Sequence, residues 1–406
     1  MKVLHVIPSY EPAWRFGGTV TATSNLCRAL AKKGIDVTVY TTDADGKGGY
    51  LDVPLNEPLD LGGVKVWYFH CDLLPKDAFY SRGLAKKLKE TVKDFDIVHV
   101  SAIWQWIQVN VYKACKKQNK PYIVTPHSSL MNYAFKFGPK LNKKIYWKLF
   151  GKKTIKKASA IHFLCEGERE GSRSLCKDVT SFILPNGIDV NKFKRENKKG
   201  SLLRDKLGIP QEAIVLLFLG RIHPKKQIEY IIKSIPEILK YKKDVFFLIV
   251  GPIEDENYYN KLKVLLNTLK VSSNVIWIGS VKNEEVIEYY CASNIMVLPS
   301  IVEGISMAAI EAMCASLPLL VSNRVANWHE IEEDKAGVIV NPNFAEVCEA
   351  LLRLCLNPEL IKRLSINARK SAEKRYDINK VADLMIKAYE DVLTGRRSPE
   401  LKWEKF

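Results

Sequence analysis

Short apolar runs alternate with longer amphipathic segments along most of the chain. Helical or loop segments separate the runs, and the first of these segments opens at Gly17-Gly18 and stops at Gly34. Strands that alternate with helices in this way favour a parallel sheet with helices on both faces. Before residue 185 the predicted strands are Val3–Ser9, Val37–Thr41, Val64–Phe69, Ile97–Val100, Tyr122–Thr125, Ile161–Leu164 and Phe182–Leu184.

The alternation is interrupted once and then restarts. Pro185-Asn186-Gly187-Ile188-Asp189 is turn chemistry, and a polar, basic stretch at 192–200 follows it, so we place a domain boundary there. The predicted domains are 1–193 and 194–375, followed by a C-terminal helical segment with a basic tail at 376–406. The tail from residue 394 is expected to be poorly ordered. In the second domain we predict strands at Ile214–Leu219, Val245–Val250, Val275–Ile278 and Ile295–Leu298. The predicted helices are Ile228–Tyr241, a second helix that follows Gly251-Pro252 and ends at about Lys270, and a third around Glu284–Cys291.

Composition agrees with two globular domains. The chain has 406 residues, of which 47% are hydrophobic, so each half can bury a core of its own. The apolar runs are too short to cross a bilayer, and the N-terminus lacks the regions of a signal peptide. The nine cysteines contain no CxxC pair, which argues against a zinc site or a disulfide framework. We therefore expect a cytoplasmic protein.

The positive charge is concentrated in the first half of the chain. Residues 1–200 carry 34 Lys+Arg and 18 Asp+Glu, whereas the remainder carries 28 and 27. No acidic residue lies between Asp96 and Glu166, while 13 lysines fall between Lys113 and Lys157. Within 133–157, aromatic and aliphatic residues are interleaved with lysines at near-helical spacing. This pattern is typical either of an interfacial helix on an anionic membrane or of an ordinary helix with solvated lysines, and we favour the membrane slightly.

The densest chemical signal lies between residues 298 and 313. A strand ends at Pro299, a loop carries Glu303 and Gly304, and a helix begins near Ser306. Unpaired amides at a helix start suit a phosphate, and glycine lets the backbone approach a ligand closely. Glu303 is placed to accept hydrogen bonds from sugar hydroxyls and Glu311 to reach a ribose. Taken singly, each of these glutamates fits a solvated surface acid better.

A second signal follows a buried strand and precedes a helix. In the segment Gly220–Gln227, Arg221 and Lys226 would project from the carboxyl end of the strand. Two cations there would clamp a diphosphate and stabilise the charge on a departing nucleotide. Asp43-Ala44-Asp45 resembles a metal-binding DxD motif, but its place after the second strand favours a solvated turn. We therefore predict no metal and no cofactor beyond the co-substrate.

Gly220-Arg221…Lys226, followed by Glu303-x7-Glu311 within Pro-Ser-x-x-Glu-Gly-x-Ser-Met, resembles family 4 of the retaining glycosyltransferases. Three further matches lie earlier in the chain, in the same order as in the family: Gly17-Gly18, Thr125-Pro126-His127 and Pro185–Asp189. The resemblance covers essentially the whole chain. It implies a GT-B architecture, in which two Rossmann-like domains with doubly wound parallel sheets face each other across a cleft, and a C-terminal helix that returns to the first domain.

The resemblance also implies roles for individual positions. Arg221 and Lys226 would bind the donor diphosphate, Glu303 would contact the transferred sugar, and His127 would lie near the sugar's hydroxymethyl group. Glu311 would bind the ribose. The backbone near the base and phosphates would come from Gly17, Gly18, Val281, Gly304, Ile305, Ser306, Met307 and Ala308. Three positions depart from the family pattern, because Ser128, Gln227 and Ser316 stand where glycine is common, and the first two are expected to alter loop geometry near the donor.

The function implied is retaining, metal-independent transfer of a sugar from a nucleotide diphosphate-sugar, UDP- or GDP-linked, to a sugar or lipid-linked acceptor in bacterial cell-surface polysaccharide synthesis. The alternatives are a sugar-nucleotide epimerase and a non-catalytic nucleotide-sugar-binding subunit. We expect a cytoplasmic enzyme, peripheral on the inner face of the membrane if residues 113–157 bind anionic lipid, and no nucleic-acid partner. Acceptor recognition is expected in the loops at 10–20, 72–85, 101–109 and 128–145.

Overall fold

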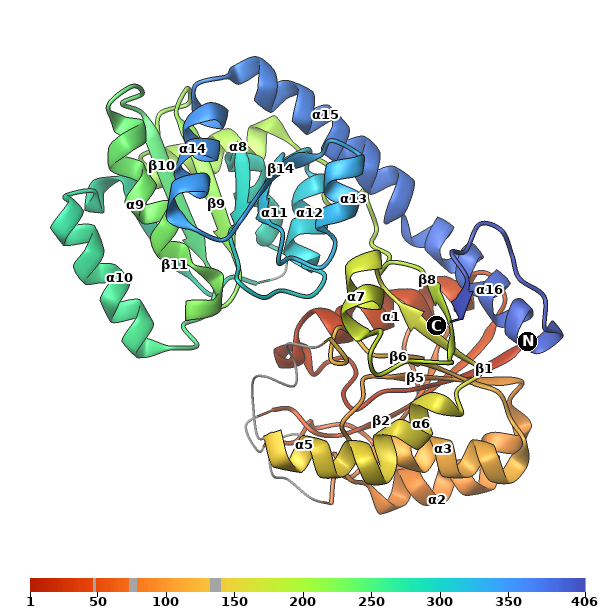
Figure 1. Ribbon diagram of the computed structural model, residues 1–406. Coiled ribbons are helices and arrows are strands. Elements are labelled where there is room, and N and C mark those ends of the chain that lie inside the picture. The colour runs from red at the N-terminus through yellow and green to blue at the C-terminus, as the bar shows by residue number, and fades with distance from the viewer. Residues whose placement is uncertain (47–48, 73–78, 132–139, 283, 406) are drawn as a thin grey trace. The chain divides into compact units, whose positions relative to one another are not determined.

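The computed structural model describes the chain except for residues 47–48, 73–78, 132–139, 283 and 406. The chain forms two compact units (Figure 1). Unit 1 contains Met1–Ile188 and Asp377–Phe406, and unit 2 contains Asp189–Tyr376. Each unit is built on a largely parallel sheet with helices packed against it, so the predicted α/β fold class with two Rossmann-like domains is confirmed.

The sheet of unit 1 has nine strands in the order β15-β8-β7-β6-β5-β1-β2-β4-β3. The two edge strands, β3 and β15, pair antiparallel with their neighbours, and the others are parallel. Sequence analysis missed both edge strands, which are only two or three residues long. The bounds are β1 Lys2–Val6, β2 Asp36–Thr42, β3 Pro58–Asp60, β4 Lys65–Phe69, β5 Ile97–Ser101, β6 Tyr122–Thr125, β7 Ala160–Phe163, β8 Thr180–Ile183 and β15 Glu404–Lys405.

Helices cover both faces of this sheet and bury two separate apolar clusters. One cluster takes its helical side chains from α2, α3 and α6, and the other from α1 and α16. The strands contribute to both, since successive side chains point to opposite faces. The helices are α1 Gly18–Lys32, α2 Arg82–Thr91, α3 Trp106–Gln118, α5 Lys140–Tyr146, a π-helical turn Trp147–Gly151, α6 Lys152–Lys156, α7 Glu166–Ser172 and α16 Ile378–Thr394, with 3-10 turns at Trp14–Phe16 and Val92–Asp94.

The C-terminal segment belongs to unit 1. Helix α16 packs on α1 and places the buried ring of Tyr389 against the sheet. The expectation of a poorly ordered tail was wrong for the described residues up to 405. Leu401 is buried, and the indole of Trp403 donates to Asp391 Oδ2 over 3.1 Å. The guanidinium of Arg397 lies over the Trp403 ring at 4.3 Å, so an aromatic anchor orders this basic tail.

Unit 2 has a six-stranded sheet, entirely parallel, in the order β11-β10-β9-β12-β13-β14. Successive strands therefore run outward from β9 to β11, and the chain then crosses back to β12 and continues to the other edge. In such sheets, ligands bind at the carboxyl ends of the strands where the order reverses, which here is between β9 and β12. The bounds are β9 Ile214–Leu219, β10 Val245–Val250, β11 Val275–Gly279, β12 Ile295–Leu298, β13 Leu319–Ser322 and β14 Gly337–Val340.

Four helices of unit 2, α10, α12, α14 and α15, begin at polar capping residues. The side chains of Asp255, Ser306, Asn343 and Asn357 each accept a hydrogen bond from an amide in the first turn that follows. Among the helices that the structure describes in either unit, none is long and apolar enough to cross a membrane. The helices of unit 2 are α8 Asn197–Leu207, α9 Ile228–Leu239, α10 Glu256–Leu269, α11 Val286–Ala292, α12 Met307–Cys314, α13 Trp328–Glu333, α14 Phe344–Cys355 and α15 Pro358–Arg375, with 3-10 turns at Pro224–Lys226 and Ser272–Asn274.

Candidate active site

Two loops of unit 2 meet where its strand order reverses. The loop after β9 runs through Gly220 to a 3-10 turn at Pro224–Lys226, and the loop after β12 leads into α12. A backbone hydrogen bond joins them, from Ile301 N to Lys225 O over 2.9 Å. The two most distinctive sequence motifs are therefore neighbours in space, although about 75 residues separate them along the chain.

Lys226 and Glu303 form an ion pair across this junction. Their side chains are only 14% and 21% exposed, so solvent screens the pair less than it would screen a surface contact. The backbone of Glu303 is held on its other side by β-type hydrogen bonds with the loop after β13, involving Arg324 and Ala326. An ammonium and a carboxylate are thus fixed side by side at the edge where a ligand is expected.

Arg221 lies on the same loop but has a different partner. Its Nη1 lies 2.5 Å from Glu254 Oε1, in the loop after β10. The side chains are 67% and 39% exposed, and such surface pairs are worth little, so the guanidinium can exchange its carboxylate partner for a phosphate at small cost. Glu254 was not singled out by the sequence analysis, because nothing in its local pattern distinguishes it from a solvated loop acid.

The loop after β12 delivers its backbone to the start of α12. Ser306 is buried and caps the helix, its Oγ accepting from Ala309 N over 3.3 Å. No acidic side chain lies in the first turn of α12, so the positive end of the helix dipole is not neutralised locally. The remaining residues predicted to contact the donor from this loop are half-buried on the same stretch: Gly304, Ile305, Met307 and Ala308.

Val281 lies apart from this junction. It follows β11, the edge strand, which is separated from β9 by β10. The residue is half-buried in a segment without regular structure. Its place at the carboxyl edge of the same sheet agrees with a backbone contact to a group that extends sideways from the phosphates.

Glu311 lies inside the second turn of α12 and is held by a tyrosine of α11. Tyr290 OH donates to Glu311 Oε2 over 2.8 Å, and the hydroxyl also lies 3.1 Å from Ala308 O. Burial raises the pKa of Glu311 to about 7, against the opposing effects of the Tyr290 hydrogen bond and the Lys192 ammonium. Tyr290, which is fully buried, was missed in the sequence because it sits on an ordinary amphipathic helix.

This pKa predicts a pH-dependent donor affinity. Ribose hydroxyls donate best to an ionised carboxylate, and the ionised fraction of Glu311 rises as the pH rises through about 7. The KM for the donor is therefore expected to fall about tenfold between pH 6 and pH 8. The measurement is the initial rate against donor concentration at both pH values.

The Glu311→Gln variant has no charge to titrate and should lose this pH dependence. Glu332→Gln, which changes an exposed carboxylate on α13, should keep the wild-type profile and serves as the control. A wild-type KM that stays flat between pH 6 and pH 8 would contradict the contact between Glu311 and the ribose that the family resemblance implies.

Unit 1 carries the remaining predicted site residues at the carboxyl edge of its own sheet. Gly17 has φ 73° and precedes Gly18, the first residue of α1, and both glycines are exposed. A Cβ on Gly17 would meet no atom within 4 Å, so its backbone conformation, rather than crowding, favours glycine there. The amide of Gly17 donates to Trp14 O over 2.9 Å, so an anion at this helix start would be met by the amides from Gly18 onward.

His127 follows β6 and lines a small cavity of about 20 Å³. Its Nε2 is buried and has no hydrogen-bond partner among the described residues, and burial lowers the pKa of the imidazole to about 3. The residue is therefore neutral at physiological pH and can donate from one ring nitrogen only. The cavity is lined by His5, Ala22, Thr23, Leu26, His99, Ser101, Thr125, His127, His162 and Asn186.

Beneath His127 lies a chain of buried hydrogen bonds. His162 Nε2 contacts the Leu184 carbonyl at 2.6 Å, and its Nδ1 contacts Thr125 Oγ1 at 2.8 Å. Thr125 Oγ1 contacts His99 Nε2 at 2.6 Å. From the other side, Tyr389 OH lies 2.8 Å from His99 Nδ1 and 3.0 Å from His5 Nε2.

The direction of this chain follows from its last acceptor. Burial lowers the pKa of all three histidines, so each carries one ring proton. A carbonyl can only accept, so the proton of His162 is on Nε2, Thr125 donates to His162, and His99 donates to Thr125. The sequence analysis assigned these histidines no role, because their contacts join residues far apart in the chain.

The three departures from the family's glycine pattern share one backbone feature. Ser128, Gln227 and Ser316 have φ values of 63°, 53° and 59°, in the left-handed region that glycine adopts most readily. All three positions therefore have a backbone conformation that suits glycine, although none of them is a glycine. At Gln227 the side chain assists, since its Nε2 donates to Pro224 O over 2.7 Å.

The Asp43-Ala44-Asp45 segment is occupied by protein contacts. Asp43 accepts from Cys71 N over 2.8 Å and contacts His70 Nδ1 at 2.9 Å, and Asp45 lies 3.7 Å from Arg15. Across the described residues, no group of three or more His, Cys, Asp or Glu side chains is arranged to hold a metal ion.

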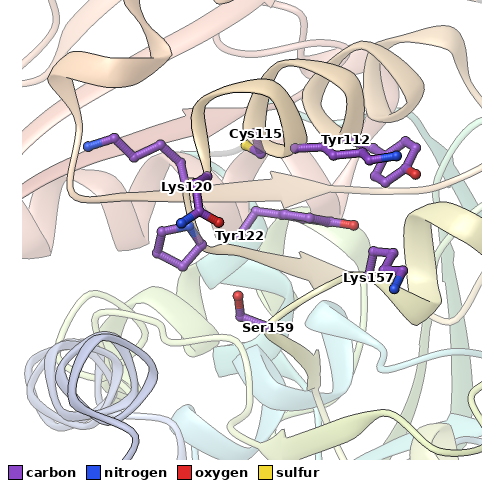
Figure 2. Close-up of a pocket in the computed structure, with 9 residues that line it drawn as sticks. Tyr112, Cys115, Lys120, Tyr122, Lys157 and Ser159 are labelled. Atoms are coloured by element: carbon purple, nitrogen blue, oxygen red, sulfur yellow. The ribbon is translucent and has the colours of Figure 1, made fainter.

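Lysines line a groove of about 440 Å³ in unit 1 (Figure 2). It lies at the end of α3 and at the first residues of β6 and β7, which is the amino edge of the sheet and therefore the opposite edge from His127. The ammonium of Lys120 donates a hydrogen bond to Phe95 O over 2.7 Å. The other cations that line the groove are Lys116 and Lys157. This groove is separate from the candidate donor site.

Comparison with known proteins identifies the class that this fold and site define. Residues 201–371 match the family described as glycosyl transferases group 1, and residues 16–192 match glycosyltransferase family 4. The α-monoglucosyldiacylglycerol synthase of Acholeplasma laidlawii is 27% identical over 371 residues, which cover 88% of this chain and 89% of that protein.

Solved structures show the same fold. Sucrose-phosphate synthase from Thermosynechococcus elongatus superposes with a TM-score of 0.77 at 18% identity, over 97% of this chain and all of that one. HepE of Anabaena, solved in complex with UDP, gives 0.76 at 16% identity, over 96% and 100%. The protein is a glycosyltransferase of GT-B fold. Within that class it belongs to family 4, the group 1 glycosyltransferases.

Proposed function

We propose that the protein catalyses retaining, metal-independent transfer of a sugar from a UDP-linked donor to a lipid-linked or sugar acceptor. The observation that carries this proposal is the Lys226–Glu303 ion pair beside the start of α12, at the reversal point of the unit 2 sheet. It offers a cation for phosphate and an anion for sugar hydroxyls within one junction. The preference for UDP over GDP draws on HepE, whose complex contains UDP.

The proposed chemistry begins with loosening of the bond between the sugar and the diphosphate. Lys226, Arg221 and the amides at the start of α12 stabilise the charge that develops on the leaving diphosphate. Glu303 orients the sugar through its hydroxyls. The acceptor hydroxyl then enters from the face that the diphosphate leaves, and its proton passes to the leaving phosphate oxygen, so the anomeric configuration is retained.

From unit 1 we propose two contributions to the same reaction. The start of α1 contacts the donor phosphates, with Gly17 letting the backbone come close and the amides from Gly18 onward donating. The neutral imidazole of His127 hydrogen-bonds the sugar near its hydroxymethyl group. A neutral histidine suits this task, because it donates or accepts without adding charge beside the forming oxocarbenium ion.

For the acceptor we propose a lipid or lipid-linked glycan, with a product that belongs to the cell surface. The support is the similarity to α-monoglucosyldiacylglycerol synthase, whose product is a glycosylated lipid. A lipid-linked acceptor also agrees with the concentration of positive charge in unit 1. The predicted acceptor loops at 72–85 and 128–145 lie partly outside the described residues. In the loop at 101–109, Trp106 is 36% exposed, whereas the Trp104 indole donates to Ser129 O over 2.8 Å.

The experiment presents UDP-glucose, UDP-galactose or GDP-mannose together with diacylglycerol or an undecaprenyl diphosphate-linked sugar in vesicles, and each reaction is run with and without EDTA. We expect transfer from one UDP-sugar, a rate that EDTA leaves unchanged, and an α-linked product by NMR. A β-linked product would contradict retention, and loss of the rate in EDTA that Mg²⁺ restores would contradict metal independence.

The same assay separates the two alternative functions. An epimerised nucleotide sugar, formed from the donor without acceptor, would identify an epimerase. A donor that raises the melting temperature but is never transferred would identify a binding subunit, since a ligand that binds only the native state stabilises it. The family membership favours neither alternative.

We further propose that unit 1 associates with anionic membranes through the segment 140–156. Ile145 and Leu149, one helical turn apart, are 49% and 53% exposed, and the lysines beside them are exposed as well. An apolar pair flanked by Lys144, Lys148 and Lys152 is the pattern of an interfacial helix. The first part of the predicted basic helix, 133–139, lies outside the described residues.

Sedimentation with vesicles tests this association. We expect binding to phosphatidylglycerol vesicles but not to phosphatidylcholine vesicles, and weakening on the order of tenfold or more in the Ile145→Glu/Leu149→Glu variant. Leu202→Glu, which changes a residue in unit 2 that is 60% exposed, is the matched control and should bind like the wild type. Equal binding to the two vesicle types would contradict the proposal.

A further inference from the structure

The turn that carries His127 has an unusual backbone. His127 and the next residue, Ser128, have φ values of 49° and 63°, so two successive residues with side chains adopt the left-handed conformation. That conformation brings Cβ close to the following carbonyl oxygen, so L-residues avoid it unless other contacts compensate. From within, Ser129 N and Ser129 Oγ stabilise the turn by donating to Pro126 O over 3.2 and 2.5 Å, and a contact from outside would add to these bonds.

A buried glutamate of α7 supplies the contact. Glu168 is fully buried, and its Oε1 accepts from Ser128 N. Its Oε2 accepts from Leu164 N over 2.8 Å. The bond to Leu164 resembles the usual capping of a helix start by a glutamate in the first turn. The bond to Ser128 spans 40 residues, so local capping does not account for it.

The side chain of Glu168 is engaged by backbone amides on both of its oxygens. Among the ion pairs that the structure describes, none includes Glu168, and its carboxyl oxygens accept from the two backbone amides. Burial raises the pKa of Glu168 to about 7, while the amide hydrogen bonds from Leu164 and Ser128 act in the opposite direction. A carboxylate can accept at both oxygens together, which neither an amide nor a hydroxyl side chain can do.

A glycine of α7 lets the helix pack closely against the turn. Gly171 lies one turn beyond Glu168, and a Cβ built on it would come within 2.9 Å of Met131 Cε and 3.2 Å of Met131 Cγ. The absence of a side chain at Gly171 therefore lets α7 approach the end of the 127–131 turn. Glu168 and Gly171, three residues apart, lie on the same face of the helix.

We propose that Glu168 is a positioning residue for sugar transfer, which holds the left-handed turn at His127–Ser128 so that the His127 imidazole is presented to the donor sugar. The inference rests on the proposed role of His127. Glu168 itself touches no reacting atom and acts through the backbone amide of Ser128.

The test first weakens the contact of Glu168 with the turn and then, in a second variant, relieves the backbone strain at Ser128. Glu168→Gln offers one carbonyl oxygen and an NH2 group, so one of the two amides loses its acceptor. We expect kcat to fall on the order of 10- to 100-fold with the KM for UDP-glucose changed far less, because a reacting group is misplaced rather than lost. Adding Ser128→Gly should restore most of the rate, since glycine adopts φ near 60° without steric cost.

Two control variants and two further measurements complete the set. Glu170→Gln changes an exposed glutamate on the same helix and should leave kcat unchanged. Hydrogen–deuterium exchange of residues 126–131 should speed up in Glu168→Gln, which reports the loosened turn directly and without substrate. The melting temperature shows whether the variant remains folded, and Ser128→Gly alone should keep nearly the wild-type rate.

Two results would overturn the proposal: a folded Glu168→Gln protein with the wild-type kcat, or a slow one whose rate Ser128→Gly does not restore. His127→Ala distinguishes this failure from a failure of the proposed function. If His127→Ala is as fast as the wild type, the role of His127 is wrong. If His127→Ala is slow while Glu168→Gln is not, only the positioning role of Glu168 fails.

Discussion

Replacing Lys226 with alanine is expected to lower kcat by a factor on the order of 10²–10³, the usual loss when one preorganised donor to a developing charge is removed. Lys226 is the cation held against Glu303 and is only 14% exposed, so its charge acts where screening by solvent is weak. The variant also leaves the Glu303 carboxylate without its ammonium. The measurement is the steady-state rate with the donor and acceptor identified by the vesicle assay.

The neighbouring lysine is the matched control. Lys225 contributes its backbone carbonyl to the loop junction, and Lys225→Ala preserves that carbonyl, so the variant should stay within about twofold of the wild-type rate. Arg221→Ala is expected to cost less than Lys226→Ala, because the guanidinium is 67% exposed. Wild-type rates in both Arg221→Ala and Lys226→Ala would overturn the assignment of the diphosphate site.

Replacing Gly251 with alanine is expected to destabilise unit 2 by about 4 kcal/mol or more, which is exceptional for one methyl group. Gly251 has φ 138°, and a Cβ on it would lie 2.0 Å from Gly220 O and 2.7 Å from Gly220 C. The obstruction is backbone and cannot rotate away. Because Gly220 precedes Arg221, any relaxation would also displace the donor loop. Urea unfolding followed by circular dichroism measures the loss.

Gly208 provides a control that isolates backbone strain from the clash. Its φ is 68°, and a Cβ on it would meet no atom within 4 Å. Gly208→Ala should therefore cost about 1–2 kcal/mol, the price of the left-handed conformation alone. Equal losses in the two variants would show that the close approach of Gly251 to Gly220 does not limit the stability of unit 2.

Much of the fold could be predicted because its signals are local. Buried strands of a parallel sheet form continuous apolar runs, and β6, β9, β10 and β12 fall at the predicted residues. The short edge strands β3 and β15 were missed because they bury too little to show a pattern. The tail was misjudged for a related reason, since its order depends on the contacts of Trp403 with Asp391 and Arg397.

The candidate site divides in the same way. Residues within a motif, such as Glu303 and Glu311, could be chosen from spacing and chemistry. Their partners could not, because Tyr290 and Glu254 lie on other elements and look ordinary in the sequence. The buried histidine chain is the extreme case, since Tyr389 and His5 are 384 residues apart.

The sequence by itself determined the fold class, most of the strands and the chemistry of the loops that follow β9 and β12, although β13 and β14 were not predicted. These depend on hydrophobic periodicity and on turn residues, which act over a few positions. Only the tertiary structure decided which carboxylate pairs with Lys226, which side chain stabilises Glu311, and what holds His127 in a left-handed turn. Each of these is a contact between residues distant in the chain, and its energy depends on burial, which no local pattern encodes.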